Sequence, residues 1–381
     1  LSLDDVAPLC RRLPLEQRKN VARRCLRRVL DGDDALDSPE SVVKLCAVLE
    51  PLLCGDDSSM NDEALEKEQT SVASLAHLCR SDSTDDVFRV LGTLRRALGK
   101  GGSRRTAYTL PALAYRGLEL ARVANGPEFS ARKVFQFVHE TATALAGVAP
   151  ARALRVFLAA ALEADAQCLG AISYEFVSQA FILYEDELPD SKAQVKALRS
   201  MVGTLLAAEN CDAADYDALA AKATQYAAKL FRKPDQCRMV AACSHLFWPP
   251  QRVEAVEAPP PAPSGEDDDA ATVPPPAPKK EGRKRDPKRV LECLQRSLKT
   301  ADACMTSAQP PISLFVEILD HYLAHLEAGN PLITPKYIAG LVALITEHVE
   351  TMEAGEAREA VERHYANTRA LIKARGVIEL D

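Results

Sequence analysis

The residues best suited to chemistry in this sequence are two histidines set four positions apart. His321 and His325 would lie on one face of a helix, where two imidazoles can act as ligands of a zinc ion. The segment reads His-Tyr-Leu-Ala-His, so it lacks the glutamate of the zinc-protease motif, and no third ligand is close in the sequence. We therefore interpret the pair as partly exposed helix histidines and assign no metal ligand.

Other signatures of catalysis are missing from the sequence. It contains no phosphate-binding loop of the Walker type, no Gly-x-Gly-x-x-Gly fingerprint and no Gly-x-Ser-x-Gly turn. The acidic residues are spread over the chain, without a pair whose spacing singles out a general acid and a general base. The sequence thus predicts a protein that is not an enzyme, with no catalytic residue and no cofactor.

The eleven cysteines do not form a disulfide framework. Their number is odd, the chain is long, and no Cys-x-x-Cys occurs. Most lie at apolar helical positions next to Leu, Ala or Val, among them Cys25, Cys46, Cys79, Cys243 and Cys293. We interpret them as reduced core thiols of a cytosolic protein.

The composition is that of an ordinary folded chain. Of 381 residues, 47% are hydrophobic and 27% charged, which excludes wholesale disorder. The formal net charge of −7 excludes a globally basic surface for nucleic acid. No stretch approaches the roughly 20 apolar residues of a membrane span. The chain begins at Leu1 without a secretory signal, so we expect a fragment of a longer protein.

The elements that must position any functional residue are helices. Few glycines and aromatic residues accompany many Ala, Leu, Arg and Glu residues, and helix-start signals such as Ser38-Pro39-Glu40 and Ser83-Thr84-Asp85-Asp86 recur. One helix is expected to start at each of these two signals. The apolar pattern predicts further helices at about 63–80, 104–123, 128–147, 150–164, 171–186, 190–208, 213–232, 235–248, 287–305, 311–327, 335–351 and 355–374.

The short joints between these helices make successive helices antiparallel neighbours. Helix pairs that recur about every 40 residues can bury one continuous core by stacking, as HEAT and armadillo arrays do. We therefore predict an all-α fold, a HEAT-like right-handed α-solenoid of antiparallel helix pairs. An irregular helical bundle is the alternative, because the repeats share no sequence signature.

One segment interrupts the helical pattern. Residues 249–278 hold ten of the 24 prolines around an acidic run, which can neither continue a helix nor bury a core. The basic run that follows, Lys279–Arg285, resembles a nuclear-localisation signal or a nucleic-acid tail, or is the solvated end of a linker. The predicted organisation is 1–248 as solenoid repeats, 249–286 as a disordered Pro-rich and charged loop, and 287–381 as further repeats of the same array.

Three charged groups are candidates for binding. The first predicted helix carries Arg23, Arg24, Arg27 and Arg28, which could meet phosphates or an acidic partner. Two further groups suit a contact between two copies of the chain: the acidic cluster Glu185, Asp186, Glu187 and Asp190, and the basic cluster Lys229, Arg232 and Lys233. For all three groups the alternative is a solvated helix face.

Longer motifs are recognisable as those of a known family. They are Tyr174–Phe181, Leu183–Glu187, Asp190–Gln194, Lys233–Gln236 and Cys243–Trp248, supported by Arg105–Pro111, Arg289–Leu294, Phe315–Leu319 and His364–Thr368. Together they closely resemble the C-terminal half of the vacuolar protein sorting-associated protein 35 family, the large subunit of the retromer coat. The resemblance covers roughly Ala22 to Lys373.

The resemblance implies a right-handed α-solenoid that works as a scaffold on the cytosolic face of endosomes, peripheral to the membrane, in retrograde transport of cargo to the Golgi or plasma membrane. It implies that the concave face holds a small phosphoesterase-like subunit, vacuolar protein sorting-associated protein 29. Our candidate groove residues are Phe315, Leu319, Tyr322 and Tyr365, for which burial between helices is the alternative.

The resemblance also implies that two copies meet through the C-terminal solenoid, where the acidic and basic clusters match the family contact. Arg232 stands where the family pattern has a lysine, which keeps the charge but not the geometry. The family's Pro-Arg-Leu-Tyr-Leu motif, which docks an arrestin-like subunit, does not occur here, so we do not expect this chain to bind that subunit. The insertion 249–286 is longer than the family loop.

The alternative function is a generic adaptor or a helical-repeat protein that binds nucleic acid. The nucleic-acid surface would consist of the Arg-rich first helix and the run Lys279–Arg289. The net charge and the lack of aromatic residues beside these bases argue against it, and we predict no nucleic-acid partner.

Overall fold

The computed structural model describes residues 3–32, 35–55, 60–124, 128–250, 283–306 and 310–378. Within these ranges the chain is helical and contains no β-strand, apart from one isolated bridge between Leu36 and Cys79. The all-α prediction is therefore confirmed. The chain divides into two compact units, the first spanning Leu1–Cys211 and the second Asp212–Asp381.

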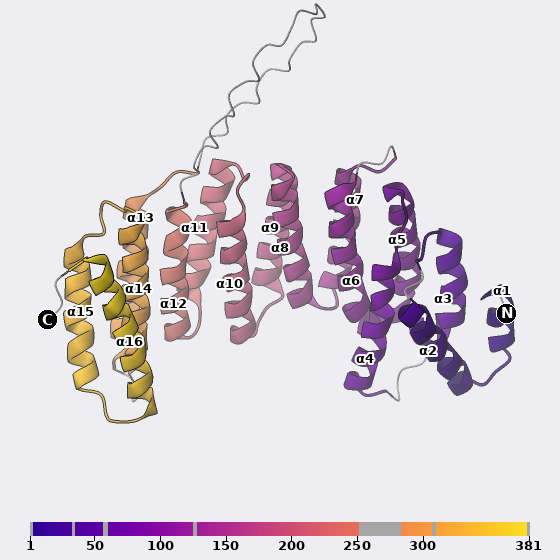
Figure 1. Ribbon diagram of the computed structural model, residues 1–381, viewed down its shortest axis with the longest axis horizontal. Helices are drawn as coiled ribbons and strands as arrows, with labels where there is room; N and C mark the ends of the chain where they lie inside the picture. Colours follow the sequence, from indigo (N-terminus) through magenta and orange to yellow (C-terminus); the bar gives the residue numbers. More distant parts are fainter. Residues whose placement is uncertain are drawn as a thin grey trace, which may run out of the picture. The chain divides into compact units, whose positions relative to one another are not determined.

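The first unit consists of helices joined by short turns (Figure 1). Its elements are α1 (Leu3–Cys10), α2 (Leu15–Gly32), α3 (Pro39–Leu53), α4 (Asp62–Ala73), η1 (Ser74–Leu78), α5 (Thr84–Leu98), η2 (Gly99–Gly101), α6 (Gly102–Val123), α7 (Ala131–Ala146), α8 (Pro150–Ala166), α9 (Gly170–Asp186) and α10 (Ser191–Ala207), where η marks a 3₁₀ helix.

Short polar side chains fix where several of these helices begin. Ser38 Oγ accepts a hydrogen bond from the backbone N–H of Ser41 at 3.3 Å, and Pro39 follows as the first helical residue. Asn61 caps α4 in the same way at 2.8 Å, and Ser83 caps α5 at 3.4 Å. These bonds satisfy backbone donors that have no partner inside the helix.

The helices of the first unit stack in a repeating order. Each of α7, α8 and α9 packs on the helix before it, and α6 with α8, α7 with α9 and α8 with α10 pack as second neighbours. Hydrogen bonds join side chains one repeat apart: Arg23 to Glu68, Arg95 to Glu140 and Arg122 to Glu163 span 45, 45 and 41 residues. This is the packing of a HEAT-like array, whose pairs bury one core.

The core of the first unit contains a connected set of aromatic rings. Phe135, Phe157 and Phe176 come from α7, α8 and α9, and the Phe176 ring centroid lies 6.0 Å from that of Phe135 and 6.1 Å from that of Phe157. All three are buried. Each ring buries a large apolar area, so truncating any of them would leave a cavity between the three helices.

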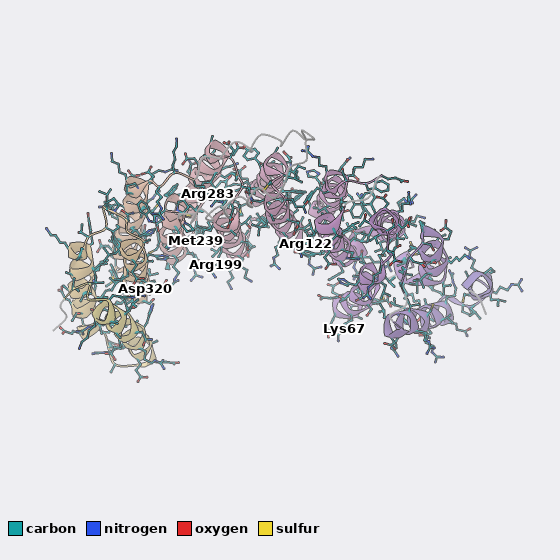
Figure 2. The ribbon with its side chains drawn as sticks, turned by 45° about the horizontal axis from the view of Figure 1, so that its top comes forward. Lys67, Arg122, Arg199, Met239, Arg283 and Asp320 are labelled. Atoms are coloured by element: carbon teal, nitrogen blue, oxygen red, sulfur yellow. The ribbon has the colours of Figure 1, made fainter. Side chains whose placement is uncertain are left out.

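The second unit repeats this construction. Its elements are α11 (Ala213–Lys229), α12 (Lys233–Cys243), η3 (Ser244–Phe247), α13 (Pro287–Cys304), α14 (Ser313–Glu327), α15 (Pro335–Glu350) and α16 (Glu356–Arg375). Here α12 packs on α13 and α14, and α14 packs on α15 and α16. Figure 2 labels Met239, a buried residue of α12, and Asp320 on α14.

The Pro-rich segment lies almost wholly outside the described residues, because 251–282 are not among them. Its predicted disorder therefore stays a prediction. The two ends are described and adjacent: the backbone N–H of Asp286 donates to the carbonyl of Phe247 at 2.9 Å, and Arg285 Nε donates to the carbonyl of Pro249 at 2.9 Å. Residues 233–247 and 287–304 consequently pack together within one unit.

The division at Cys211 differs from the predicted boundaries, which placed 1–248 in one block before the insertion. Those boundaries stay a prediction. Some helix ends differ from the expected ones. The helix expected at 235–248 is α12 followed by the 3₁₀ turn η3, and the one expected at 213–232 ends at Lys229. Leu230, which caps α11, has φ −56° and ψ 142°, outside the helical region.

Candidate functional site

The acidic cluster lies at the junction of α9 and α10. Glu185 and Asp186 occupy the last turn of α9, Glu187 is its C-cap, and all three side chains are exposed. Carboxylates are unfavourable at the negative end of the helix dipole, by about 0.3–1 kcal/mol each. The three acids at this end of α9 therefore lower the stability of the helix, and a cationic partner would relieve this unfavourable interaction.

Asp190 has a second role. Its Oδ2 accepts a hydrogen bond from the backbone N–H of Ala193 at 2.7 Å, so it caps α10 while its side chain stays at the surface. Its charge is favourable there, at the positive end of α10.

The basic cluster lies at the junction of α11 and α12. Lys229 is in the last turn of α11, Arg232 is the N-cap of α12 and Lys233 is the first residue of that helix. Lys229, Arg232 and Lys233 are all exposed. Lys233 Nζ donates to Gln236 Oε1 at 3.1 Å, and Arg232 Nε lies 3.9 Å from Asp235 Oδ2. Two cations at a helix N-terminus again oppose the dipole. The structure thus gathers the members of each cluster at one helix junction.

Between Lys229 and Arg232 lies a residue that sequence reasoning missed. The Phe231 side chain is 86% exposed, the largest value among the exposed large hydrophobic residues described, while the preceding Leu230 is buried. The available signal was an aromatic residue inside a short joint between bases. The apolar pattern instead assigns the position to the interior of a helix, where exposure cannot be told from the sequence.

The four candidate groove residues lie in the second unit and are buried. Phe315, Leu319 and Tyr322 are on α14 and Tyr365 is on α16, and none is more than 6% exposed. Phe315 contacts the ring of His348 on α15, with centroids 5.4 Å apart. The hydroxyl of Tyr365 lies 2.9 Å from the α15 carbonyl of Val342, to which it donates. These side chains join α14, α15 and α16, and their contact with a partner stays a prediction.

Exposed apolar residues lie close to this packed group. Tyr337, at the start of α15, stacks on Tyr322 with centroids 5.7 Å apart, and its own ring is partly exposed. Leu332, in the joint between α14 and α15, is exposed to a similar degree. A protein that docks on this part of the second unit would meet Tyr337 and Leu332 first, with the buried residues as the support beneath them.

The histidine pair differs from the expectation of partly exposed residues, which was wrong for His325. This side chain is 1% exposed, and its ring stacks on His245 of η3 at 4.5 Å between centroids. His325 Nε2 lies 2.8 Å from Ser244 Oγ, and His245 Nε2 lies 2.9 Å from His321 Nδ1. Burial lowers the pKa of His245 to about 4 and that of His325 to about 3, so both rings are neutral at pH 7.

The basic segments proposed for nucleic acid are partly engaged within the chain. Arg23 of α2 bonds to Glu68. Arg283, labelled in Figure 2, lies over Tyr216 at 4.2 Å from the guanidinium carbon to the ring centroid; Arg285 lies over Trp248 at 4.7 Å and Arg289 over Phe247 at 3.9 Å. Arg289 also pairs with Asp217. Aromatic residues therefore do accompany these bases, but they pack against them as part of the fold.

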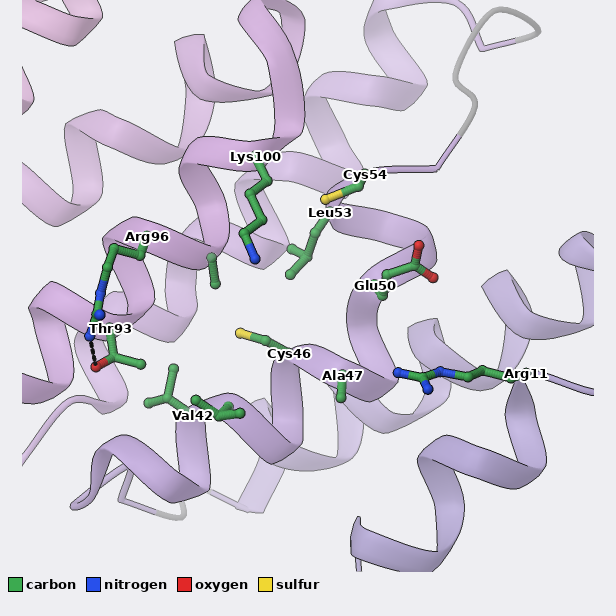
Figure 3. Close-up of a pocket in the computed structure, with 12 residues that line it drawn as sticks. Arg11, Val42, Cys46, Ala47, Glu50, Leu53, Cys54, Thr93, Arg96 and Lys100 are labelled. Carbon is green, nitrogen blue, oxygen red and sulfur yellow. Dashed lines mark hydrogen bonds between the residues drawn. The ribbon is translucent and has the colours of Figure 1, made fainter.

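A pocket of about 490 Å³ opens between α3 and α5 in the first unit, with Arg11 at one end (Figure 3). Its walls are mainly apolar, and the side chains of Cys46 and Lys100 point into it. Burial raises the pKa of the Cys46 thiol to about 11. The thiol is therefore protonated at pH 7 and is a poor nucleophile.

The described residues contain no group of three or more His, Cys, Asp or Glu side chains placed to hold a metal ion. In the same part of the chain, no helix combines the length and the apolar character that a membrane crossing requires. All eleven cysteines have free thiols; Cys79, Cys243 and Cys293 are buried, whereas Cys54 and Cys168 are exposed.

Comparison with known proteins agrees with the motifs and the helical-repeat packing. The family model described as vacuolar protein sorting-associated protein 35 matches residues 1–348. The chain belongs to this family. It is 34% identical over 353 residues to vacuolar protein sorting-associated protein 35B of Arabidopsis thaliana, covering 87% of this chain and 41% of the relative.

Two further relatives give the same picture. Vacuolar protein sorting-associated protein 35A of Arabidopsis thaliana is 32% identical over 368 residues, covering 91% of this chain and 43% of that protein. Vacuolar protein sorting-associated protein 35 of Schizosaccharomyces pombe is 29% identical over 361 residues, covering 92% of this chain and 39% of that protein. The chain spans about two fifths of the length of the relatives it matches.

Proposed function

We propose that this chain is the C-terminal scaffold part of a retromer large subunit, which acts in protein sorting on the cytosolic face of endosomes. The observation that carries the proposal is the family match over residues 1–348. The stacked helices suit the task, because such arrays present long surfaces to other proteins. No chemical step is assigned to the chain; it contributes binding surfaces to retrograde transport to the Golgi or plasma membrane.

Two partners follow from the proposal. The first is a second copy of the chain, with the acidic cluster of one copy facing the basic cluster of the other. Support comes from the exposure of all seven side chains to solvent and from the unfavourable placement of several of them relative to helix dipoles. Exposed ion pairs contribute only about 0–1 kcal/mol each, so several must act together.

The second partner is the small phosphoesterase-like subunit, which would dock on α14, α15 and the joint between them. Buried Phe315, Leu319, Tyr322 and Tyr365 would give this surface its shape. The partner would then cover Tyr337 and Leu332, which are exposed in the chain alone. Large side chains that become buried on binding are the usual source of affinity in such interfaces.

The decisive experiment is co-purification of the chain with the small subunit. We expect a stable complex that Tyr337→Asp weakens at least about tenfold, because a carboxylate would be buried at the contact. Val123→Asp in the first unit is the matched control, since Val123 is also exposed on a helix. No binding by the unchanged chain, or equal loss with both variants, would refute the docking site.

Nucleic acid is tested separately by a mobility shift at about 150 mM salt, where a protein that neutralises several phosphates shows steep salt dependence. We expect no shift. Tight, salt-steep binding of RNA or DNA would favour the alternative function.

A further inference from the structure

Among the exposed large hydrophobic residues that the structure describes, Phe231 has the most exposed side chain. Buried aromatic side chains stabilise proteins and complexes, whereas an exposed one gains nothing from the hydrophobic effect. At 86% exposure, almost all of the ring faces solvent, although the adjacent Leu230 is anchored in the core of the second unit. The joint is therefore fixed, and it holds Phe231 outward.

The surroundings of Phe231 indicate what can cover it. Lys229, Arg232 and Lys233 all lie within two residues of it, and all three are exposed. An apolar ring bordered by cations fits a partner surface that offers an apolar side chain bordered by carboxylates.

The chain carries such a surface on α9. Ile182 is 45% exposed, and Glu185 and Asp186 follow it at three and four residues. Residues at these separations share one face of a helix. Among the exposed large hydrophobic residues of the described ranges, Ile182 is the one followed by carboxylates at both of these helical positions. The two patches are thus each centred on one apolar side chain and are opposite in charge.

We propose that Phe231 of one copy packs on Ile182 of a second copy, as the apolar centre of the self-association contact. The three cations around Phe231 then meet the carboxylates beside Ile182, and together they shield the apolar pair from water. This inference rests on the proposed self-association and adds to it a named pair of residues. It also changes the expected salt dependence of self-association, because the contact between apolar side chains persists at salt concentrations that screen exposed charges.

The test is sedimentation equilibrium of the chain and its variants. Phe231→Ala should weaken self-association about 10- to 100-fold, the loss expected for a large side chain that is buried on binding. Ile182→Ala should weaken it in the same direction, and the double variant should be little weaker than Phe231→Ala alone, since either change removes the same contact. Val123→Ala, another exposed apolar residue, is the control and should leave self-association unchanged.

A triple variant with Lys229→Glu, Arg232→Glu and Lys233→Glu separates the charged contact from the apolar contact. If this triple variant is monomeric while Phe231→Ala stays within about twofold of the unchanged chain, the charged contact stands and the apolar centre is wrong. If the triple variant associates normally, the proposed charged contact is wrong, and the effect of Phe231→Ala then decides the apolar pair by itself. An unchanged chain that stays monomeric overturns both. Thermal unfolding of each variant checks that the fold is intact.

Discussion

The carboxylate of Asp165 accepts a hydrogen bond from the backbone N–H of Asn210 at 2.8 Å, 45 residues further along the chain. The backbone N–H of Glu209 donates to the other carboxylate oxygen of Asp165 at 2.6 Å. The side-chain amide of Asn210 donates to the backbone carbonyl of Asp165 at 2.8 Å. Asp85 makes the equivalent pair of bonds to Glu128 and Phe129. In both cases a buried aspartate in one helix fixes the backbone of a later joint. Asp165 of α8 binds the joint that follows α10, and Asp85 of α5 binds the joint that precedes α7.

Asp165→Ala should therefore lower the free energy of unfolding of the first unit by about 2–4 kcal/mol, because it leaves two backbone donors without partners. Chemical denaturation followed by far-UV circular dichroism measures the change. Glu187→Ala is a suitable reference. Glu187 caps α9 through its backbone N–H, which the substitution keeps, so only an exposed carboxylate is lost and stability should change by less than about 1 kcal/mol. Equal effects of the two substitutions would show that the Asp165 bonds do not stabilise the fold.

Asp190 allows capping to be separated from charge. Asp190→Asn keeps a good N-cap for α10, whereas Asp190→Ala removes the bond to Ala193, so only the alanine variant should lose about 1 kcal/mol of stability. Both substitutions remove one negative charge and should weaken self-association by a similar factor. Thermal melts and sedimentation distinguish these outcomes. Normal self-association of both variants would exclude Asp190 from the contact.

Helices were predictable from this sequence because their signals are local. Apolar spacing and caps such as Ser38 act within a few residues, so most helix ends agree with expectation to within about three positions. The 3₁₀ turn after α12 was not predictable, because the apolar pattern continues through Leu246 and Phe247 while the backbone tightens.

The functional surfaces were only partly predictable, because the exposure of an apolar side chain depends on packing that local signals do not show. Charge runs such as Glu185–Glu187 are visible in the sequence and are exposed in the structure. Large apolar residues are ambiguous: Phe315 and Phe231 both occupy positions that the sequence assigns to helices, yet one is buried and the other faces solvent. The bond from Asn210 to Asp165 depends on the stacking of repeats, and no local pattern marks a pairing across 45 residues.

Replacing residues 251–282 by a short flexible linker should leave the second unit as stable as before, to within about 1 kcal/mol, because the length of a surface loop has little effect on folding entropy. The contacts that fix both ends, from Asp286 to Phe247 and from Arg285 to Pro249, are retained in this deletion. Urea unfolding followed by the fluorescence of Trp248, the single tryptophan, reports on this unit. A large drop in stability would contradict the prediction that the insertion adds nothing to the core.

Acidification should destabilise the second unit through its buried histidines. The pKa of His245 is about 4 and that of His325 about 3 in the folded chain, against an ordinary 6.5, because burial disfavours the charged rings. Burial likewise lowers the pKa of His321, although Asp320 and Glu317 oppose the shift. Well above pH 6.5 the rings are neutral whether the chain is folded or unfolded, and their contribution to stability is fully present. As the pH falls through this value, the unfolded chain binds protons that the folded chain does not, so stability decreases.

At about pH 5 the loss for His245 and His325 together should be about 2–4 kcal/mol relative to about pH 7. Urea unfolding followed by Trp248 fluorescence measures it, because the Trp248 indole donates to the carbonyl of Ala328, next to the C-terminus of α14, the helix that carries His325. Replacing both residues by glutamine should abolish most of the pH dependence, while His77→Gln, at an exposed position, should not. Equal pH dependence in the double glutamine variant would assign the acid sensitivity to carboxylates instead of the histidine cluster.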